Sequence, residues 1–243
     1  MTGTPALLFL PGALDRLEGS DAAARRLGES RRLIHIRYRP DDTFDALLTR
    51  ILAVADESGA GPLDLLGQSY GGWIGQCLAR LHPLRVRRLV LSHSFVLTPG
   101  QAWRLRLGSR ILRGLPLPVM RPLLLARVRR ALAPLARTDP ERVEQQIAQV
   151  ALELQNPDFR AKLGAQQGCM AESLKRPLPA MRSDMPILIL ESDDDPLVPR
   201  RARQALRQTY PGPQVHRFPA AGHISALAET SIYAETVQAF LDR

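Results

Sequence analysis

Short apolar runs alternate with amphipathic segments over the first hundred residues of the chain. The apolar runs are short enough for buried strands, and the longer segments carry apolar residues at helical spacing. Alternation of this kind favours a mostly parallel sheet with helices on both of its faces. The predicted strands in this part are 6–10, 33–36, 63–66 and 88–92, and the predicted helices are 43–55 and 70–81.

The pattern changes between residues 98 and 185. This stretch contains helical segments separated by prolines and no convincing strand. Asp139-Pro140-Glu141 and Asn156-Pro157-Asp158 both have the chemistry of a helix start, with a capping side chain followed by proline and an acid. Strand character resumes at 186–190 and 214–218, with helices predicted from about Pro199 and from about 226 to 241.

The predicted organisation is therefore an α/β core formed by residues 1–97 and 186–243, interrupted by a helical insertion over 98–185. The insertion leaves from the carboxyl end of a strand. Open α/β sheets bind their ligands at that edge. We therefore expect the insertion to act as a cap, or lid, over an active site.

Net charge is +9, and its excess lies in one part of the insertion. The segment 99–138 contains nine arginines and no acidic residue, whereas the 24 basic and 24 acidic residues elsewhere balance. The nine are Arg104, Arg106, Arg110, Arg113, Arg121, Arg127, Arg129, Arg130 and Arg137. A charge asymmetry of this kind belongs to one module of the protein and not to its whole surface.

Other classes of protein fit the composition poorly. Two cysteines, Cys77 and Cys169, are too few for a disulfide framework and are expected to be ordinary thiols. There is no apolar run of about 18 residues and no signal-peptide pattern after Met1–Pro5, so we expect a cytoplasmic protein without an integral membrane segment. Aromatic residues make up only 5% of the chain and no nucleic-acid-binding module is present, so we expect no nucleic-acid partner.

A Gly-x-Ser-x-Gly pentapeptide, Gly67 to Gly71, is the strongest chemical signal. By itself this pattern is weak, but here an apolar strand precedes it and a predicted helix follows. A tight strand-to-helix turn of this type exposes the serine and leaves room only for small residues on either side. Ser69 is therefore the candidate nucleophile.

A serine hydroxyl needs a base to remove its proton and a carboxylate to orient that base. Asp195 follows the predicted strand 186–190, and His223 follows the last strand after Gly222. The order serine, acid, histidine is the one found when this chemistry is built on a nucleophile turn. The remaining histidines lie in strands, at a helix end or beside a strand, and the loop position of His223 makes it the candidate base.

Together these features resemble the α/β-hydrolase superfamily over almost the whole chain, from Ala6 to Leu241. The resemblance implies an α/β-hydrolase fold of about six strands, with the family's N-terminal antiparallel hairpin absent. It also implies an oxyanion hole formed by the backbone N–H groups of Ala13 and Tyr70, with Pro11 where the family more often has histidine. The acid motif resembles Gly-x-x-Asp-x-x-Val-Pro with Ser192 at the glycine position. Asp194 stays open as an alternative acid to Asp195.

Two further features bear on substrate binding. The segment Arg88–Phe95 resembles maspardin-like members of the superfamily, some of which are regarded as interaction proteins. His93 in this segment is expected near the crevice, either contacting substrate or as a polar loop residue. In the insertion, Trp103, Leu107 and Ile111 lie on one face of an amphipathic helix, and Trp103 is a second candidate substrate contact.

The sequence thus predicts a serine hydrolase that cleaves an ester, thioester or lactone of a small, partly apolar acyl group, without metal or organic cofactor. The alternatives are a maspardin-like interaction protein without catalysis and an acyltransferase with the same triad. The arginine-rich helices are either a solvated surface, a feature that attracts an anionic substrate, or a contact for anionic lipid. Substrate identity and oligomeric state stay open.

Overall fold

The computed structural model describes residues 6–14, 18–59 and 61–243 of the chain. Met1–Pro5, the segment considered above for a leader, lies outside them. Within the described residues six strands form one sheet in the order β2-β1-β3-β4-β5-β6, and every neighbouring pair is parallel. The predicted six-stranded α/β architecture is confirmed. The strands are β1 (Leu7–Leu10), β2 (Leu33–His35), β3 (Leu63–Gln68), β4 (Val86–Ser92), β5 (Ile187–Ser192) and β6 (Gln214–Phe218).

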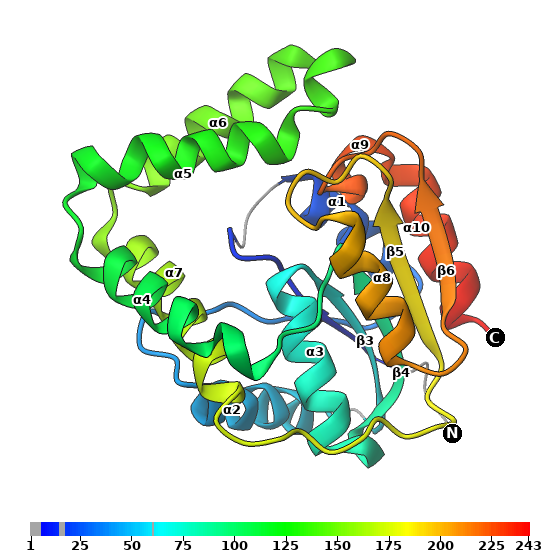
Figure 1. Ribbon diagram of the computed structural model, residues 1–243. Coiled ribbons are helices and arrows are strands. Elements are labelled where there is room, and N and C mark those ends of the chain that lie inside the picture. The colour runs from blue at the N-terminus through cyan, green and yellow to red at the C-terminus, as the bar shows by residue number, and fades with distance from the viewer. Residues whose placement is uncertain (1–5, 15–17, 60) are drawn as a thin grey trace. The chain divides into compact units, whose positions relative to one another are not determined.

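Helices occupy the connections between these strands and most of the insertion (Figure 1). The ten α-helices among the described residues are α1 (Glu18–Gly28), α2 (Phe44–Glu57), α3 (Tyr70–Leu81), α4 (Ala102–Gly114), α5 (Leu117–Leu132), α6 (Pro140–Glu153), α7 (Pro157–Ser173), α8 (Arg200–Thr209), α9 (Ser225–Ala228) and α10 (Thr230–Leu241).

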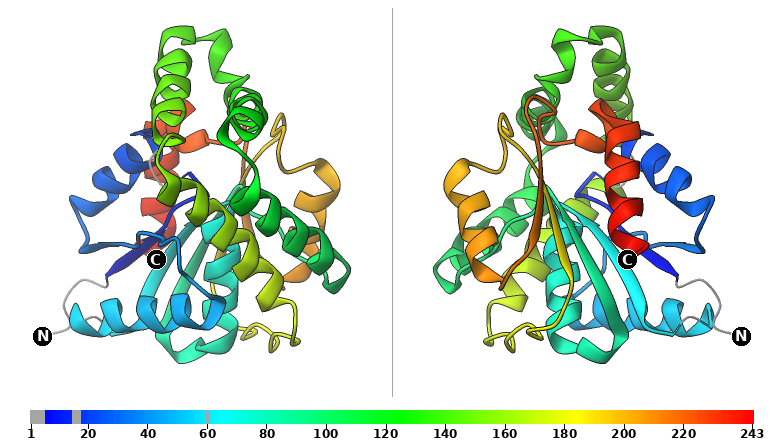
Figure 2. Two further views of the ribbon diagram at one scale, coloured as in Figure 1. Left: turned by 90° about the vertical axis from the view of Figure 1, so that its left-hand side faces the viewer. Right: turned by 90° about the vertical axis from the view of Figure 1, so that its right-hand side faces the viewer.

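Both faces of the sheet are covered, α1 and α10 lying on one face and α3 and α8 on the other (Figures 1 and 2). Alternate residues of β1 point to opposite faces, as the pleat of a strand requires. Leu7 and Phe9 belong to the core cluster that includes α1 and α10. Leu10 points the other way, and its Cδ1 lies 3.6 Å from where a Cβ on Gly75 of α3 would stand. Burial on both faces explains why the strands are continuous apolar runs.

Two elements differ from the sequence prediction. Helix α1 was not predicted, although a parallel connection between β1 and β2 requires a crossover of this kind. The predicted helix over 226–241 is two helices, α9 and α10, which meet at Glu229 with φ −129° and ψ 49°. A hydrophobic pattern continues through a break of one residue, so it does not reveal the break.

The described chain divides into two compact units. The first comprises 1–37, 48–96 and 178–243, and the second comprises 38–47 and 97–177. The sequence interpretation placed residues 38–47 in the core. Three contacts join them to α7 and the residues after it: the Phe44 N–H donates to Glu172 at 2.8 Å, the Cys169 thiol donates to the Asp42 carbonyl at 3.4 Å, and Arg176 pairs with Asp45 at 2.5 Å.

Within the second unit α4 packs along α7, and α5 packs along α6. Helices α6 and α7 begin at the predicted caps, where Asp139 accepts the N–H of Arg142 at 3.0 Å and Asn156 accepts that of Asp158 at 2.9 Å. Cys77 and Cys169 are buried and free, as expected. In the part of the chain that the structure describes, no helix has both the length and the apolar character needed to cross a membrane.

The closest backbone approach around the nucleophile turn is at Gly71. A Cβ atom there would lie 2.1 Å from the carbonyl oxygen of Leu10 and 2.5 Å from that of Pro11. We predict that Gly71→Ala lowers the free energy of unfolding by about 3 kcal/mol, because a backbone clash cannot be relieved by a side-chain rotation. Gly61→Ala is the control, since a Cβ there meets nothing within 4 Å. Urea denaturation of the two variants measures this, and an equal small effect in both would contradict it.

Candidate active site

Ser69 lies in a strained turn between β3 and α3. Its φ is 51° and its ψ is −111°, a backbone conformation that residues other than glycine rarely adopt. Two contacts to the end of β4 hold it there: the Ser69 N–H donates to the Ser92 carbonyl at 2.8 Å, and the Ser94 hydroxyl donates to the Ser69 carbonyl at 3.1 Å. The turn is therefore held in place by the neighbouring strand.

Three glycines make this turn possible. Cβ atoms on Gly67 and Gly71 would lie 2.6 and 2.1 Å from backbone carbonyl oxygens. The sequence interpretation named these two. Gly72 is equally constrained, since a Cβ there would be 2.4 Å from the Ser94 hydroxyl oxygen. The Gly-Gly pair at 71–72 was visible in the sequence, but its second member packs against a residue 22 positions away.

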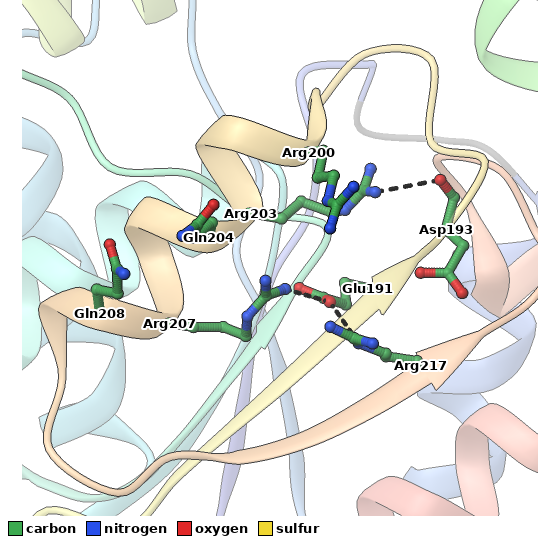
Figure 3. Close-up of a pocket in the computed structure, with 8 residues that line it drawn as sticks. All are labelled: Glu191, Asp193, Arg200, Arg203, Gln204, Arg207, Gln208 and Arg217. Carbon is green, nitrogen blue, oxygen red and sulfur yellow. Dashed lines mark hydrogen bonds and ion pairs between the residues drawn. The ribbon is translucent and has the colours of Figure 1, made fainter.

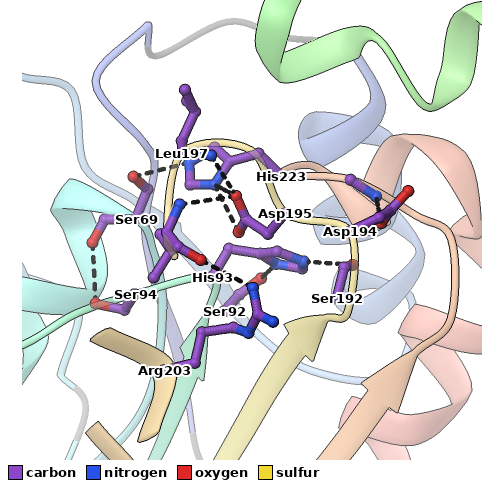
Figure 4. A network of polar contacts seen from close by, with 12 residues as sticks. Ser69, Ser92, His93, Ser94, Ser192, Asp194, Asp195, Leu197, Arg203 and His223 are labelled. Carbon is purple, nitrogen blue, oxygen red and sulfur yellow. Dashed lines mark hydrogen bonds and ion pairs between the residues drawn. The ribbon is translucent and has the colours of Figure 1, made fainter. Parts of the chain in front are cut away.

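The structure brings Ser69, His223 and Asp195 into one chain of hydrogen bonds (Figure 4). The Nε2 of His223 lies 3.1 Å from the Ser69 hydroxyl oxygen. The Nδ1 of the same ring lies 2.9 and 3.1 Å from the two carboxylate oxygens of Asp195. A carboxylate only accepts hydrogen bonds, so Nδ1 carries the proton and Nε2 is left as an acceptor for the serine hydroxyl.

Asp195, and not Asp194, contacts the histidine ring. One Asp195 oxygen also accepts the backbone N–H groups of Leu197 and Val198 at 2.8 and 2.9 Å. Asp194 instead accepts the Gly222 N–H at 2.9 Å. This hydrogen bond connects the loop after β5, which carries Asp195, to the loop after β6, which carries His223. The two adjacent acids, which the sequence could not separate, have different contacts here.

The surroundings of Asp195 favour its ionised form. Burial by itself raises the pKa of this carboxyl, but the hydrogen bond and charge of His223, with further help from His93 and the Val198 N–H, outweigh burial. The pKa of Asp195 consequently lies below its usual value. A carboxylate is thus available to orient the ring at neutral pH.

Arg203 of α8 contacts both ends of the loop that carries Asp195. It was not identified from the sequence as a residue of the site. Its guanidinium donates to the carbonyl of Val198 at 2.9 Å and to that of Asp193 at 3.1 Å. These two residues flank Asp195. Arginine is abundant in this chain, so no sequence signal distinguished Arg203 from its neighbours.

The turn after β1 lies beside Ser69. A Cβ on Gly12 would stand 3.8 Å from the Ser69 Cβ. Ala13 follows in this turn, and Tyr70 begins α3 directly after the serine. The use of their two N–H groups as an oxyanion hole stays a prediction.

His93 follows the end of β4 and is buried. Its side chain is 2% exposed, and its φ is 48°. The ring nitrogens lie 3.2 Å from the Ser92 hydroxyl and 3.0 Å from the Ser192 hydroxyl, and the ring meets that of His223 edge to face at 5.8 Å. His93 is therefore packed beside His223, and its contact with substrate stays a prediction.

Trp103, the other candidate substrate contact, lies on α4 in the second unit and is 63% exposed. Its role in substrate binding stays a prediction. Among the described residues no group of three histidine, cysteine, aspartate or glutamate side chains could hold a metal ion.

A polar cavity of about 600 Å³ lies between α8 and the strands β5 and β6 (Figure 3). Arg207 and Arg217 both pair with one oxygen of Glu191 there. None of Ser69, Asp195 and His223 lines it, although Arg203 does. The cavity is thus separate from the hydrogen-bonded chain of Figure 4, and Arg203 borders both.

Burial of His93 makes a testable contribution to stability. Desolvation, then the nearby His223 charge, lower the pKa of His93 to about 3, although Asp195 opposes and Arg203 adds to this effect. An unfolded histidine has a pKa of about 6.5, so between these values only the unfolded chain binds the proton. Stability must therefore fall as the pH is lowered through this window.

We predict that the free energy of unfolding of the wild type, relative to His93→Asn, falls by about 2 kcal/mol between about pH 7 and about pH 5. Asparagine is chosen because it tolerates a positive φ. Urea denaturation at a series of pH values measures the difference, and His82→Asn at the end of α3 is the control. Parallel pH curves for wild type and His93→Asn would show that His93 is not held neutral in the folded protein.

Comparison with known proteins agrees with this architecture. The family model of the α/β hydrolase fold matches residues 25–230. A 2-hydroxymuconate semialdehyde hydrolase of Pseudomonas putida is 27% identical over 196 residues, which are 78% of this chain and 66% of that protein, just under two thirds of its length.

Two solved structures illustrate the shared fold. An enol-lactonase from Burkholderia xenovorans LB400 has a TM-score of 0.77 at 17% identity, covering 99% of this chain and 92% of that one. A thermophilic esterase from Thermogutta terrifontis has a TM-score of 0.77 at 22% identity, covering 99% of this chain and 91% of that one. At these identities the similarity concerns the fold alone. With the family model matched over most of its length, the chain belongs to the α/β-hydrolase fold family.

Proposed function

We propose that this protein is a serine hydrolase that cleaves an ester, thioester or lactone of a small, partly apolar acyl group. The observation that carries the proposal is the continuous chain from the Ser69 hydroxyl through His223 to Asp195, with distances of 3.1 and 2.9 Å. These three groups come from three separate loops. Such an arrangement activates a hydroxyl for attack on a carbonyl carbon.

The reaction begins with attack of the Ser69 oxygen on the substrate carbonyl while Nε2 of His223 takes the hydroxyl proton. Asp195 keeps the ring in the tautomer that leaves Nε2 free to accept, and it stabilises the imidazolium that forms. The negative charge on the substrate oxygen is stabilised by the N–H groups of Ala13 and Tyr70. Known donors of this type contribute roughly 3–4 kcal/mol each.

Collapse of this intermediate expels the alcohol or thiol, which receives its proton from His223. Water then attacks the acyl-enzyme, with His223 now removing a proton from the water. Collapse of this second intermediate breaks the bond to the Ser69 oxygen, which takes that proton back from His223 as the carboxylic acid leaves. No metal or organic cofactor takes part in these steps. The predicted cap over 98–185, of which 98–177 belong to the second unit, would set the substrate range.

A carbon–carbon bond is a second possible target. The observation in its favour is the similarity to a semialdehyde hydrolase, whereas the lactonase and the esterase match in fold. Product analysis with two substrates of the same acyl group, its ester and a β-diketone whose C–C cleavage expels a stabilised enolate, separates the two possibilities. The ester alone should be turned over if the present proposal is right.

An interaction protein without turnover, resembling maspardin, is the rival hypothesis from a different class. It rests on the segment Arg88–Phe95 alone. An acyltransferase would share all three residues and differ only in the acceptor that attacks the acyl-enzyme. Adding candidate alcohols to the assay and analysing the products distinguishes water from another acceptor.

We predict that a fluorophosphonate probe labels the folded protein covalently at Ser69, and that Ser69→Ala abolishes the adduct. His223→Ala should slow labelling by about 10³-fold or more, because the hydroxyl then lacks its base. His82→Ala is the matched control and should label like the wild type. Intact-protein mass spectrometry measures the adduct, and circular dichroism checks that each variant is folded.

Variants of the two adjacent acids, Asp195 and Asp194, extend this labelling experiment. Asp195→Asn should also slow labelling strongly, since it removes the carboxylate that orients His223. Asp194→Asn should slow it much less, since Asp194 accepts the Gly222 N–H whereas the ring of His223 contacts Asp195. No adduct on wild type, under conditions that label a known serine hydrolase, would overturn the enzyme proposal.

A further inference from the structure

Helix α4 has one packed face and one open face. The packed face lies on α7 of the same unit (Figures 1 and 2). There the Ser109 hydroxyl donates to the Gly164 carbonyl at 2.8 Å, and a Cβ on Gly108 would lie 3.4 Å from the Gln167 side-chain oxygen. Small residues thus allow α4 and α7 to approach closely, so this side of α4 is covered by α7.

The open face of α4 carries large apolar side chains. Trp103, Leu107 and Ile111 recur every four residues and are 63%, 49% and 41% exposed. Helical geometry places them together, on the side away from Gly108 and Ser109. Single exposed apolar residues are common on proteins, but an aligned row that includes an exposed tryptophan is characteristic of a contact surface.

Exposed arginines border this row on both sides. At 100° per residue, Arg104 falls beyond Ile111 on one side and Arg110 and Arg106 fall on the other. The Arg104 guanidinium lies 5.8 Å from the centre of the Trp103 ring. All nine arginines of segment 99–138 are exposed, and this segment has no acidic residue to neutralise them.

The next helix repeats the combination. Val119 and Leu123 on α5 are 51% and 64% exposed, and Arg121 and Arg127 beside them are exposed as well. An apolar row bordered by arginine, with tryptophan at one end, has the composition of helices that lie in the interface of a bilayer. Arginine attracts anionic headgroups while the apolar side chains enter the acyl boundary.

Other occupants fit less well. A nucleic acid would use the positive charge but leave the apolar row unsatisfied. A second copy of this chain, docked through the same face, would bring two arginine clusters together in a symmetric contact. A soluble anionic substrate would meet the charge without covering a row that extends over nine residues, from Trp103 to Ile111. Charge and apolar area are both matched by an anionic lipid surface.

We propose that the α4 row, defined as Trp103, Leu107 and Ile111 with the bordering Arg104, Arg106 and Arg110, docks on the surface of a bilayer that contains anionic phospholipid. This surface would bring the protein to substrates that reside in or near lipid. The inference concerns binding alone and does not depend on Ser69 being a nucleophile.

The chain provides its own probe for this interaction. It has two tryptophans, of which Trp73 is 2% exposed in α3 and Trp103 is exposed on α4. Vesicles of equal parts phosphatidylglycerol and phosphatidylcholine should shift the tryptophan emission to shorter wavelength and carry the protein into the pellet on centrifugation. Both effects should weaken as salt is added, and vesicles of phosphatidylcholine alone should bind much less.

Matched variants separate the two contributions. Arg106→Gln/Arg110→Gln should weaken binding to the mixed vesicles by roughly tenfold or more. Its charge-matched control is Arg25→Gln/Arg201→Gln, which removes two exposed arginines of the first unit. Leu107→Ser should also weaken binding, whereas Leu152→Ser, an equally apolar residue that is 64% exposed on α6, should not.

Binding should persist in Ser69→Ala, so failure of the hydrolase proposal leaves this test intact. The inference is overturned if mixed vesicles do not sediment the protein at low salt, or if both lipid compositions bind it equally. It is also overturned if the two control variants lose as much binding as the α4 variants. If a soluble coenzyme A ester shifts the Trp103 emission and vesicles do not bind, the α4 row binds an anionic substrate and not a bilayer.

Discussion

The close contact between the start of α3 and the end of β1 is the constraint on which the candidate site depends. The position of a Gly71 Cβ, 2.1 Å from the Leu10 carbonyl oxygen, leaves no room for a side chain. This approach lets Ser69 occupy a positive-φ turn with the Gly12 turn beside it. The turn that carries the proposed nucleophile and the turn that carries Ala13 are therefore packed against each other.

Parallel pairing brings the remaining groups to the same edge. Gly67 pairs with Leu91, and Ser92 pairs with Leu190, so the ends of β3, β4 and β5 are aligned. The loops that leave these ends carry Ser69, His93 and Asp195, while His223 comes from the loop after β6. Loops alone would hold such side chains loosely. Here a rigid sheet positions the loops, and Arg203 and Asp194 add hydrogen bonds between them.

The residues that pack behind the candidate site are polar and buried, so their polar atoms need hydrogen-bond partners. Burial lowers the pKa of His93, and its ring, which lies between two serine hydroxyls, meets the His223 ring edge to face. Gln76 is another buried polar residue with hydrogen-bond partners. Its side chain connects Ser94 to Tyr210 through hydrogen bonds of 3.3 and 2.6 Å. Buried networks of this kind are costly if any member is lost.

Sequence alone determined the architecture, because strands buried on both faces are apolar runs and because glycine, proline and capping residues mark where elements end. It also singled out Ser69, Asp195 and His223, since a nucleophile turn restricts its neighbours to small residues. Only the tertiary structure separated Asp195 from Asp194, because adjacent acids differ in direction and not in local pattern. Likewise, the positions of His93 and Arg203 beside the candidate site could not be read from the sequence, because they depend on tertiary packing. Their contacts follow from the packing of α8 and the strand ends, which no local spacing encodes.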